Sequence, residues 1–392
     1  MATCVRSFSK INLGLGIGPV RGDGFHGLVT LYQTLDVHDF VTVTAVRADR
    51  TTISLSTNHP RVPVDARNTV WKMVEKCLAK MGVGAEVSIH IEKNLPVQGG
   101  MGAGSANAAA ALIGLERELG LKLPEGERLA LAAEVGSDVP LFLVGGAMLG
   151  TGRGELVEAV ADLPRTACVV AVPGVGVSTP AAFREWDKRY EVSGMRYEVG
   201  GSEGVGVGDG LVVKREPTSQ KRDPSTGSGQ AVGHPDLLGG LTLSGVPDRL
   251  KELSLAYASI FGQKPGTSGI VPDQNPEKKQ VDSDEGRMGL RNDLAENILL
   301  SLVRTGVEND FEEVVFPEYP SLREIKRLLM GIDTEAPALY AALSGSGSAL
   351  FGLYRSFADA ELAQQRVQQS GVTAFVTETL PRAEYWARMF AG

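Results

Sequence analysis

A glycine-rich stretch at residues 94–107 has the composition of an anion-binding loop. It reads Asn-Leu-Pro-Val-Gln-Gly-Gly-Met-Gly-Ala-Gly-Ser-Ala-Asn, and four alanines follow it. Glycines lack a Cβ and reach positive φ, so successive backbone N–H groups can converge on a phosphate, and a helix start adds unpaired donors. The glycine spacing matches neither a Walker A loop nor a dinucleotide fingerprint. We therefore predict a phosphate-binding junction, with a buried glycine-rich turn as the plainer alternative.

Asp138 is a second candidate for chemistry. It lies among apolar residues and shortly before Pro140. A carboxylate without a partner is costly in such surroundings, so a partner is expected, which could be a backbone N–H of the next turn or a cation. Lys10 also has mostly uncharged neighbours, although a lone lysine is commonly a solvated surface residue.

An aromatic residue and a histidine, Phe25 and His26, end a tight polar turn. A flat ring can stack on a nucleobase, and a ring nitrogen beside it can read the edge of the base. Simple anchoring of the loop explains the same pair. Further along, Thr179 is a natural helix N-cap and Pro180 a natural first helical residue, which is a complete structural explanation of that segment.

Periodicity predicts the elements that must position these residues. Apolar residues alternate at 86–92 and in two earlier stretches, so strands are expected at 40–46, 52–56 and 86–92. Residues 68–82 carry a single apolar stripe that ends in glycine, which indicates a helix. We also expect strands at 166–172 and 374–378, a strand, turn and strand at 340–351, and a helix at 356–371.

The composition is that of an ordinary globular protein. Of 392 residues, 43% are hydrophobic and 22% are charged, and the formal net charge is −8, which argues against general nucleic-acid binding. The spacing of Cys4, Cys77 and Cys168 fits neither disulfides nor a metal site, so a reducing cytoplasm is the simpler expectation. We expect no membrane span and no signal peptide. The oligomeric state is left open.

The motifs taken together resemble those of the GHMP kinases, a family that includes galactokinase, homoserine kinase and mevalonate kinase. The matching segments are Ser-Lys-Ile-Asn-Leu at 9–13, Leu-Tyr-Gln-Thr-Leu-Asp at 31–36, the glycine-rich loop, Gly-Ser-Asp-Val-Pro at 136–140 and Ser-Gly-Ser-Gly at 344–347. Between about 190 and 291 the resemblance lapses. That segment is polar and rich in proline and glycine, and we expect a flexible insertion.

The resemblance implies an α+β protein of two domains with the active site between them. The N-terminal domain would span residues 1–162 and contain the loop and the catalytic pair. The C-terminal domain would span residues 163–392, including the insertion at 190–291.

The resemblance also implies an ATP-dependent small-molecule kinase. Lys10 would hold Asp138 ionised, and Asp138 would accept the proton of the substrate hydroxyl. Ser105 would coordinate Mg²⁺ or a phosphate oxygen, and Asn68 would lie near the adenine or simply cap its helix. The ATP-binding residues implied in this way are Asn68, Pro96, Val97, Gln98, Gly99, Gly100, Met101, Gly102, Ala103, Gly104, Ser105 and Ala106.

Three segments resemble the family branch whose acceptor carries a cytidine diphosphate: Asp-Gly-Phe-His at 23–26, Leu-Tyr-Gln-Thr-Leu-Asp at 31–36 and Ser-Thr-Pro-Ala-Ala-Phe at 178–183. The implied reaction is phosphorylation of the 2-hydroxyl of 4-diphosphocytidyl-2-C-methyl-D-erythritol, a step of non-mevalonate isoprenoid precursor synthesis. Phe25 and Phe183 would clamp the cytosine, and the implied substrate-binding set is Asn12, Phe25, His26, Thr179 and Phe183. The alternatives are a homoserine or mevalonate type of kinase and a non-catalytic sensor with the same fold.

Five residues depart from the family pattern, among them Met101 in place of a leucine and Gly27 in place of a larger polar residue. Ala103 replaces a glycine and requires a negative φ, while Ala106 replaces a serine whose hydroxyl would reach phosphate. Phe25 replaces a tyrosine and keeps only the stacking face. These changes bear on nucleotide affinity more than on the fold.

Overall fold

The computed structural model describes residues 2–97, 99–192 and 308–391. Gln98 lies outside the described residues, and so does nearly all of the expected insertion at 190–291. The Asn-Asp-Leu segment at 292–294, which also resembles the family, lies outside them as well.

The first sheet is built from the N-terminal strands. It contains β1 (Thr3–Val20), β2 (His26–Arg47), β3 (Thr52–Thr57), β4 (Ala85–Glu92), β5 (Ala147–Thr151) and β6 (Leu156–Ala159). The strand order is β3-β4-β2-β5-β6, and β1 pairs with β2 as a long antiparallel hairpin. Residues along β4 alternate between buried and exposed, as their sequence pattern predicts.

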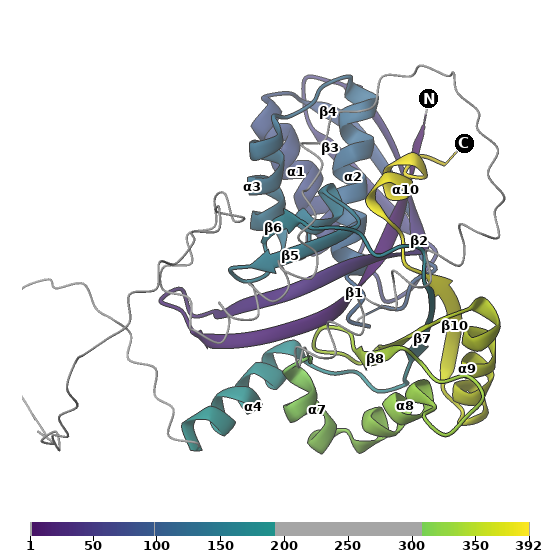
Figure 1. Ribbon diagram of the computed structural model, residues 1–392. Coiled ribbons are helices and arrows are strands. Elements are labelled where there is room, and N and C mark those ends of the chain that lie inside the picture. The colour runs from purple at the N-terminus through teal and green to yellow at the C-terminus, as the bar shows by residue number, and fades with distance from the viewer. Residues whose placement is uncertain (1, 98, 193–307, 392) are drawn as a thin grey trace, which may run out of the picture.

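Helices cover one face of this sheet (Figure 1). They are α1 (Thr69–Met81), α2 (Ala103–Leu119) and α3 (Glu125–Val135), and a 3₁₀ helix, η1 (Pro140–Leu143), follows α3. The alanines at the start of α2 are buried, so this helix packs closely on β1 and β2. Gly114 belongs to this contact, because a Cβ at that position would lie 2.8 Å from a methyl group of Val43.

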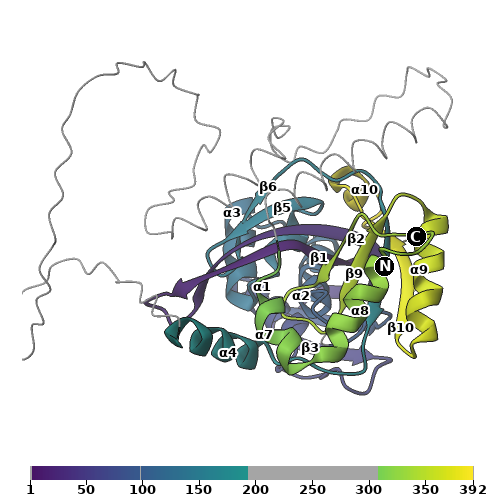
Figure 2. The same cartoon turned by 60° about the horizontal axis from the view of Figure 1, so that its bottom comes forward.

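The second sheet has the strand order β10-β7-β9-β8. Its strands are β7 (Ala167–Val172), β8 (Tyr340–Leu343), β9 (Leu350–Tyr354) and β10 (Thr373–Glu378). The helices of this part are α4 (Thr179–Val192), α7 (Phe311–Glu318), α8 (Pro320–Met330) and α9 (Phe357–Gln369), of which α8 and α9 pack directly on the strands (Figure 2). Thus every strand and helix predicted within the described residues is present.

The two sheets share a hydrophobic core. Ile11 of β1 and Leu31 of β2 pack in one cluster with Cys168 of β7 and Phe351 of β9. The β1–β2 hairpin therefore joins the two halves of the molecule. The domain boundary at 162/163 stays a prediction, although the sheets lie on either side of it.

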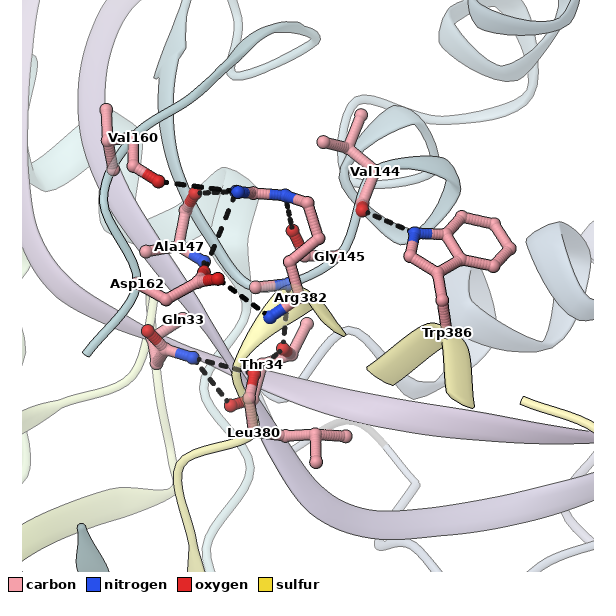
Figure 3. Close-up of polar contacts among 11 residues, drawn as sticks. Gln33, Thr34, Val144, Gly145, Ala147, Val160, Asp162, Leu380, Arg382 and Trp386 are labelled. Atoms are coloured by element: carbon pink, nitrogen blue, oxygen red, sulfur yellow. Dashed lines mark hydrogen bonds and ion pairs between the residues drawn. The ribbon is translucent and has the colours of Figure 1, made fainter. Parts of the chain in front are cut away.

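The C-terminal segment returns to the first sheet. Helix α10 (Arg382–Ala387) lies beside the N-terminal strands (Figure 1). Figure 3 shows Arg382 reaching the carbonyls of Gly145 at 2.9 Å and Ala147 at 2.6 Å, and Trp386 donating to Val144 at 3.0 Å. The last residues of the chain thus brace the segment that follows η1.

The architecture is α+β, as the motifs predict. None of the described helices is long and apolar enough to cross a membrane. The cysteines at 4, 77 and 168 are all free.

Candidate active site

The glycine-rich loop connects β4 to α2 as predicted. Gly100 and Gly102 have φ values of 74° and 69°, which only glycine adopts easily. Gly102 is the N-cap of α2, and no side chain caps this helix. Ala103 begins α2 in helical conformation, so replacing glycine there causes no backbone strain. The first turn of α2 therefore presents uncapped backbone donors, the arrangement that binds a phosphate.

A turn from the second sheet closes over this loop. The turn comprises residues 344–348 between β8 and β9 and is called the 344–348 turn below. Ser344 Oγ donates to Gly100 O at 3.0 Å, and Ala349 N donates to Gly99 O at 3.2 Å. A Cβ at Gly100 would lie only 2.3 Å from Ser344 O. The absence of a side chain at Gly100 is therefore what lets the two segments meet.

The sequence interpretation missed Asn309, which supports the 344–348 turn. Its amide donates to Leu343 O at 2.9 Å and to Gly345 O at 2.7 Å, and its oxygen accepts from Phe311 N at 3.1 Å. The side chain is buried, with all these groups paired. A lone asparagine carries no such signal in the sequence, because its carbonyl partners lie 34 and 36 residues away.

Lys10 and Asp138 form an ion pair beside the glycine-rich loop. Lys10 Nζ lies 3.5 Å from Asp138 Oδ2 and donates to Asn12 Oδ1 at 2.6 Å. The Lys10 side chain is 4% exposed, whereas that of Asp138 is 32% exposed. Asp138 is therefore not a core carboxylate, as its apolar neighbours suggested, but an accessible group with a buried cation behind it.

Gly102 brings these elements into contact. A Cβ there would lie 3.2 Å from Lys10 Cε and 2.9 Å from Phe142 Cζ of η1. The backbone of Lys10 also donates to Met101 O at 3.1 Å. The glycine-rich loop at 94–107 is called the phosphate loop below, after the ligand we expect it to bind. Strand β1, this loop and η1 thus come together at Gly102.

Tyr32 is a second residue that the sequence interpretation did not single out. Its hydroxyl lies 3.2 Å from Asp138 Oδ1, and its ring centroid lies 5.5 Å from Lys10 Nζ. Burial and then the nearby Asp138 carboxylate raise the pKa of Tyr32 well above its usual value. In the sequence, Tyr32 is one residue of the 31–36 segment that resembles the family, and nothing singles it out within that segment.

The remaining predicted ATP-binding residues surround the loop. Asn68 caps α1, since its Oδ1 accepts from Val70 N at 2.9 Å and its amide donates to Pro63 O at 2.6 Å. The capping explanation of Asn68 is thus confirmed, and a contact with adenine stays a prediction. Ser105 lies in the first turn of α2, and a Cβ at Gly136 would lie 3.8 Å from its Oγ. Pro96, Val97, Gly104 and Ala106 belong to the same loop or to the first turn of α2.

Asp39 anchors the start of the loop and was also missed. Its side chain is fully buried and pairs with Lys93. Asp39 Oδ1 accepts from Asn94 N at 2.8 Å and from Leu95 N at 2.7 Å. This carboxylate fixes the direction in which the chain leaves β4.

The predicted base-binding residues make contacts of their own in this structure, and the clamp of Phe25 and Phe183 stays a prediction. Phe183 stacks on His26, with centroids 4.8 Å apart and planes 7° apart. Phe25 is exposed and lies instead under the Arg153 guanidinium, 4.8 Å from its ring centroid. His26 also contacts Gly18 O through Nδ1 at 2.8 Å, while its Nε2 lies 3.1 Å from Asp187 Oδ1. Both ring nitrogens of His26 are therefore engaged.

Thr179 links α4 to the 344–348 turn. Its hydroxyl lies 2.6 Å from Ser346 Oγ. Helix α4 begins at Thr179 itself, and Ser178 O accepts from Ala182 N at 2.9 Å. The prediction of Thr179 as N-cap is thus wrong by one residue, because its hydroxyl bonds Ser346 across the site rather than its own helix.

Comparison with known proteins agrees with this geometry. Residues 68–146 match the GHMP kinases N terminal domain, and residues 287–373 match the GHMP kinases C terminal domain. The two matches follow the order of the motifs along the chain and together cover less than half of it.

Curated proteins that resemble this chain in sequence include several of one name. The chain is 43% identical over 188 residues to a 4-diphosphocytidyl-2-C-methyl-D-erythritol kinase of Nocardioides sp., a match that covers 47% of this chain and 63% of the relative. It is 42% identical over 200 residues to the protein of the same name from Rhodococcus jostii, covering 51% of this chain and 63% of the relative. The chain thus spans less than two thirds of the length of these relatives.

Solved structures share the fold. A crystal structure of 4-(cytidine 5'-diphospho)-2C-methyl-D-erythritol kinase matches with a TM-score of 0.57 at 22% identity and covers 96% of this chain and 98% of its own. Homoserine kinase from Cytophaga hutchinsonii matches with a TM-score of 0.56 at 18% identity, covering 97% of this chain and 95% of its own.

Proposed function

We propose that this chain phosphorylates the 2-hydroxyl of 4-diphosphocytidyl-2-C-methyl-D-erythritol with ATP, a step of the non-mevalonate route to isoprenoid precursors. The observation that carries the proposal is the pair formed by buried Lys10 and accessible Asp138, 3.5 Å apart, beside an uncapped helix N-terminus. The names of the curated relatives support the particular acceptor.

The loop fits the phosphates of ATP. The positive φ of Gly100 and Gly102 and the uncapped first turn of α2 leave backbone donors for an anion. Among the described residues, no three His, Cys, Asp or Glu side chains come together as a metal site. Mg²⁺ would therefore be held mainly by phosphate oxygens, with Ser105 as the protein ligand. When bound, the Mg²⁺–ATP complex supplies the γ-phosphoryl group and neutralises part of its charge.

Asp138 acts as the acceptor of the hydroxyl proton. The alcohol oxygen forms a bond to the γ-phosphorus, the bond to the oxygen of the departing ADP breaks, and the proton passes to Asp138. Lys10 lies 3.5 Å from the Asp138 carboxylate and offsets negative charge that develops beside it. Asn12 orients Lys10 through the 2.6 Å hydrogen bond and is itself held by Thr30 at 2.8 Å.

The cytidine group would bind between the β1–β2 hairpin tip and α4. Exposed Phe25 offers a free stacking face, and Phe183 would offer the second if the His26 ring moved aside. Thr179, already bonded to Ser346, lies between this region and the phosphate loop. Nucleotide recognition of this kind by stacked rings suits any cytosine-bearing acceptor.

One observation favours a second candidate. The His26 ring stacks on one face of Phe183, so that face is not open to a cytosine here. A kinase for a simpler alcohol, such as homoserine or mevalonate, needs no clamp of Phe25 and Phe183. A non-catalytic sensor is the third candidate, and the presence of Lys10, Asp138 and Ser105 speaks against it.

The test is release of ADP by the purified protein with ATP, Mg²⁺ and one alcohol at a time. We expect turnover with 4-diphosphocytidyl-2-C-methyl-D-erythritol and none with homoserine or mevalonate. Turnover with another alcohol would be consistent with ATP binding at the glycine-rich loop but would contradict the clamp of Phe25 and Phe183. Binding of ATP without any turnover would favour the non-catalytic sensor.

The same proposal includes a cytoplasmic location, based on the spacing of the cysteines, and a division into domains at 1–162 and 163–392. The partners would be small molecules alone, without nucleic acid or membrane. The net charge of −8 supports the absence of a nucleic-acid partner.

A further inference from the structure

Tyr32 faces the catalytic pair from the neighbouring strand. It lies directly opposite Asn12 in the pairing of β1 with β2. Lys10 and Asn12 point to the same side of β1, because alternate residues of a strand share a face. Lys10 contacts Asp138 Oδ2, and the Tyr32 hydroxyl contacts Asp138 Oδ1 at 3.2 Å. Each carboxylate oxygen therefore has its own partner, and the two partners come from two strands.

The hydroxyl of Tyr32 has one hydrogen and two acceptors within reach. Gly154 O lies 3.5 Å away, farther than the 3.2 Å to Asp138 Oδ1. The nearer acceptor is also charged, and hydrogen bonds to ionised groups are the stronger ones. Lys10, Asp138 and Glu155 are the charged groups around this phenol. Since burial and Asp138 raise its pKa, the phenol keeps its proton at neutral pH and acts as the donor.

The backbone around Tyr32 leaves the ring little freedom to move. A Cβ at Gly150 would lie 2.5 Å from Tyr32 Cε2, and a Cβ at Gly154 would lie 2.5 Å from the hydroxyl. The ring is 2% exposed. Tyr32 is therefore held rigidly against two glycines, with its hydroxyl directed at a carboxylate that is itself partly open to solvent.

We propose that Tyr32 is a positioning residue that fixes the orientation of the Asp138 carboxylate for proton acceptance. The inference rests on the proposed kinase function. Tyr32 does not touch the acceptor alcohol; it acts through Asp138. With the phenol on Oδ1 and the Lys10 ammonium on Oδ2, rotation of the carboxylate breaks both contacts. Reactive geometry of this kind depends on groups that are held in place before the substrate arrives.

The test is the kinetics of Tyr32→Phe, which removes only the hydroxyl. We expect kcat to fall about 10- to 100-fold, the value of a hydrogen bond to a charged group, while KM for ATP and for the alcohol changes little. Tyr354→Phe is the matched control, because it too removes a single buried tyrosine hydroxyl. The Tyr354 hydroxyl donates to a backbone carbonyl, Leu329 O, at 2.7 Å rather than to a carboxylate. Tyr354 lies on β9 of the second sheet, and its variant should retain kcat.

An unchanged kcat in Tyr32→Phe overturns the inference, and so does an equal loss in both variants. If the wild-type protein turned over no alcohol, the proposed function would fail separately, and a ¹³Cζ-tyrosine NMR spectrum would still decide the contact. The Tyr32 resonance, assigned by its disappearance in Tyr32→Phe, should move in Asp138→Asn while that of Tyr354 stays in place. If the chemical shift of Tyr32 is the same in Asp138→Asn as in the wild-type protein, the inference is overturned without any reference to turnover.

Discussion

At the scale of single residues, the site depends on a contrast in exposure between two opposite charges. Lys10 is buried among Asn12, Tyr32 and the loop backbone, whereas Asp138 keeps a third of its side-chain surface open. A buried ammonium with a fixed partner cannot swing toward solvent, while an accessible carboxylate can meet a substrate. This asymmetry is what suits Asp138, rather than Lys10, to exchange a proton with a bound alcohol.

Asp138→Asn should reduce kcat by about 10²- to 10⁴-fold, because the amide cannot accept the hydroxyl proton. The fold should survive, since the amide keeps the shape of the carboxylate and the side chain is partly exposed. Turnover is measured by ADP release, and folding by circular dichroism. Asp65→Asn is the control, because Asp65 is an exposed aspartate whose carboxylate pairs with Arg67. Full turnover by Asp138→Asn would rule out the mechanism.

At the scale of elements, the site is formed where loops from distant parts of the chain contact one another. The phosphate loop, the 344–348 turn and the start of α4 come from segments far apart in the chain, and each contacts the next through backbone or hydroxyl groups. Asp39 fixes one end of the phosphate loop, and Asn309 fixes the turn that covers it. Small residues at the contacts allow backbone to approach backbone, which side chains of ordinary size would prevent.

Gly100→Ala tests this close approach. The new Cβ would lie 2.3 Å from Ser344 O at a φ of 74°, so the loop or the turn must shift. We expect weaker ATP binding, seen as a raised KM for ATP or a higher Kd by calorimetry. The left-handed backbone itself costs about 1 to 2 kcal/mol of stability.

Gly82→Ala provides the control for the cost of backbone strain. Gly82 has a similar φ of 66° at the end of α1, but a Cβ there meets no atom within 4 Å. Both variants should therefore lose the stability that a left-handed backbone costs in thermal unfolding, and Gly100→Ala should lose more because of its contact with Ser344 O. Only Gly100→Ala should weaken ATP binding. If both variants raised the KM or Kd for ATP equally, or if neither raised it, the contact between Gly100 and Ser344 O would not matter for ATP binding, contrary to this prediction.

At the scale of the whole molecule, the chain passes between its two sheets more than once. The β1–β2 hairpin contributes to the core between them, and the last residues return from β10 to the first sheet. Thr34 and Gln33 of β2 both bond Leu380 O, at 2.7 and 3.0 Å, and α10 then braces the segment behind η1 (Figure 3). The position of Asp138, just before η1, thus depends on both ends of the sequence.

Arg382→Ala should destabilise the protein by about 1 to 3 kcal/mol, because it leaves the buried carbonyls of Gly145 and Ala147 without this donor. The measurement is urea unfolding. Arg327→Ala is the control, since Arg327 is 76% exposed and its ion pair with Glu324 should contribute only about 0 to 1 kcal/mol. Equal stability of the two variants would show that the C-terminal contacts are not structural.

Local pattern was sufficient to predict the elements and much of the site. The alternation in β4, the single apolar stripe of α1 and the glycines before α2 each depend on nearest neighbours, so they are visible in the sequence. The resemblance of the motifs pointed to Lys10 and Asp138, which the structure places together. Their roles in catalysis stay predictions.

Only the tertiary structure decided which polar groups face one another. Tyr32 and Asp138 are 106 residues apart, and Asn309 and Gly345 are 36 apart, so no local pattern could indicate either contact. The stacking of His26 on Phe183 likewise depends on how α4 docks against the β1–β2 hairpin. Periodicity reports which side of an element is apolar, whereas the partner of a polar atom is set by the packing of whole elements. The sequence by itself therefore determined the architecture and the glycine-rich loop between β4 and α2, and the packing determined the immediate surroundings of Asp138.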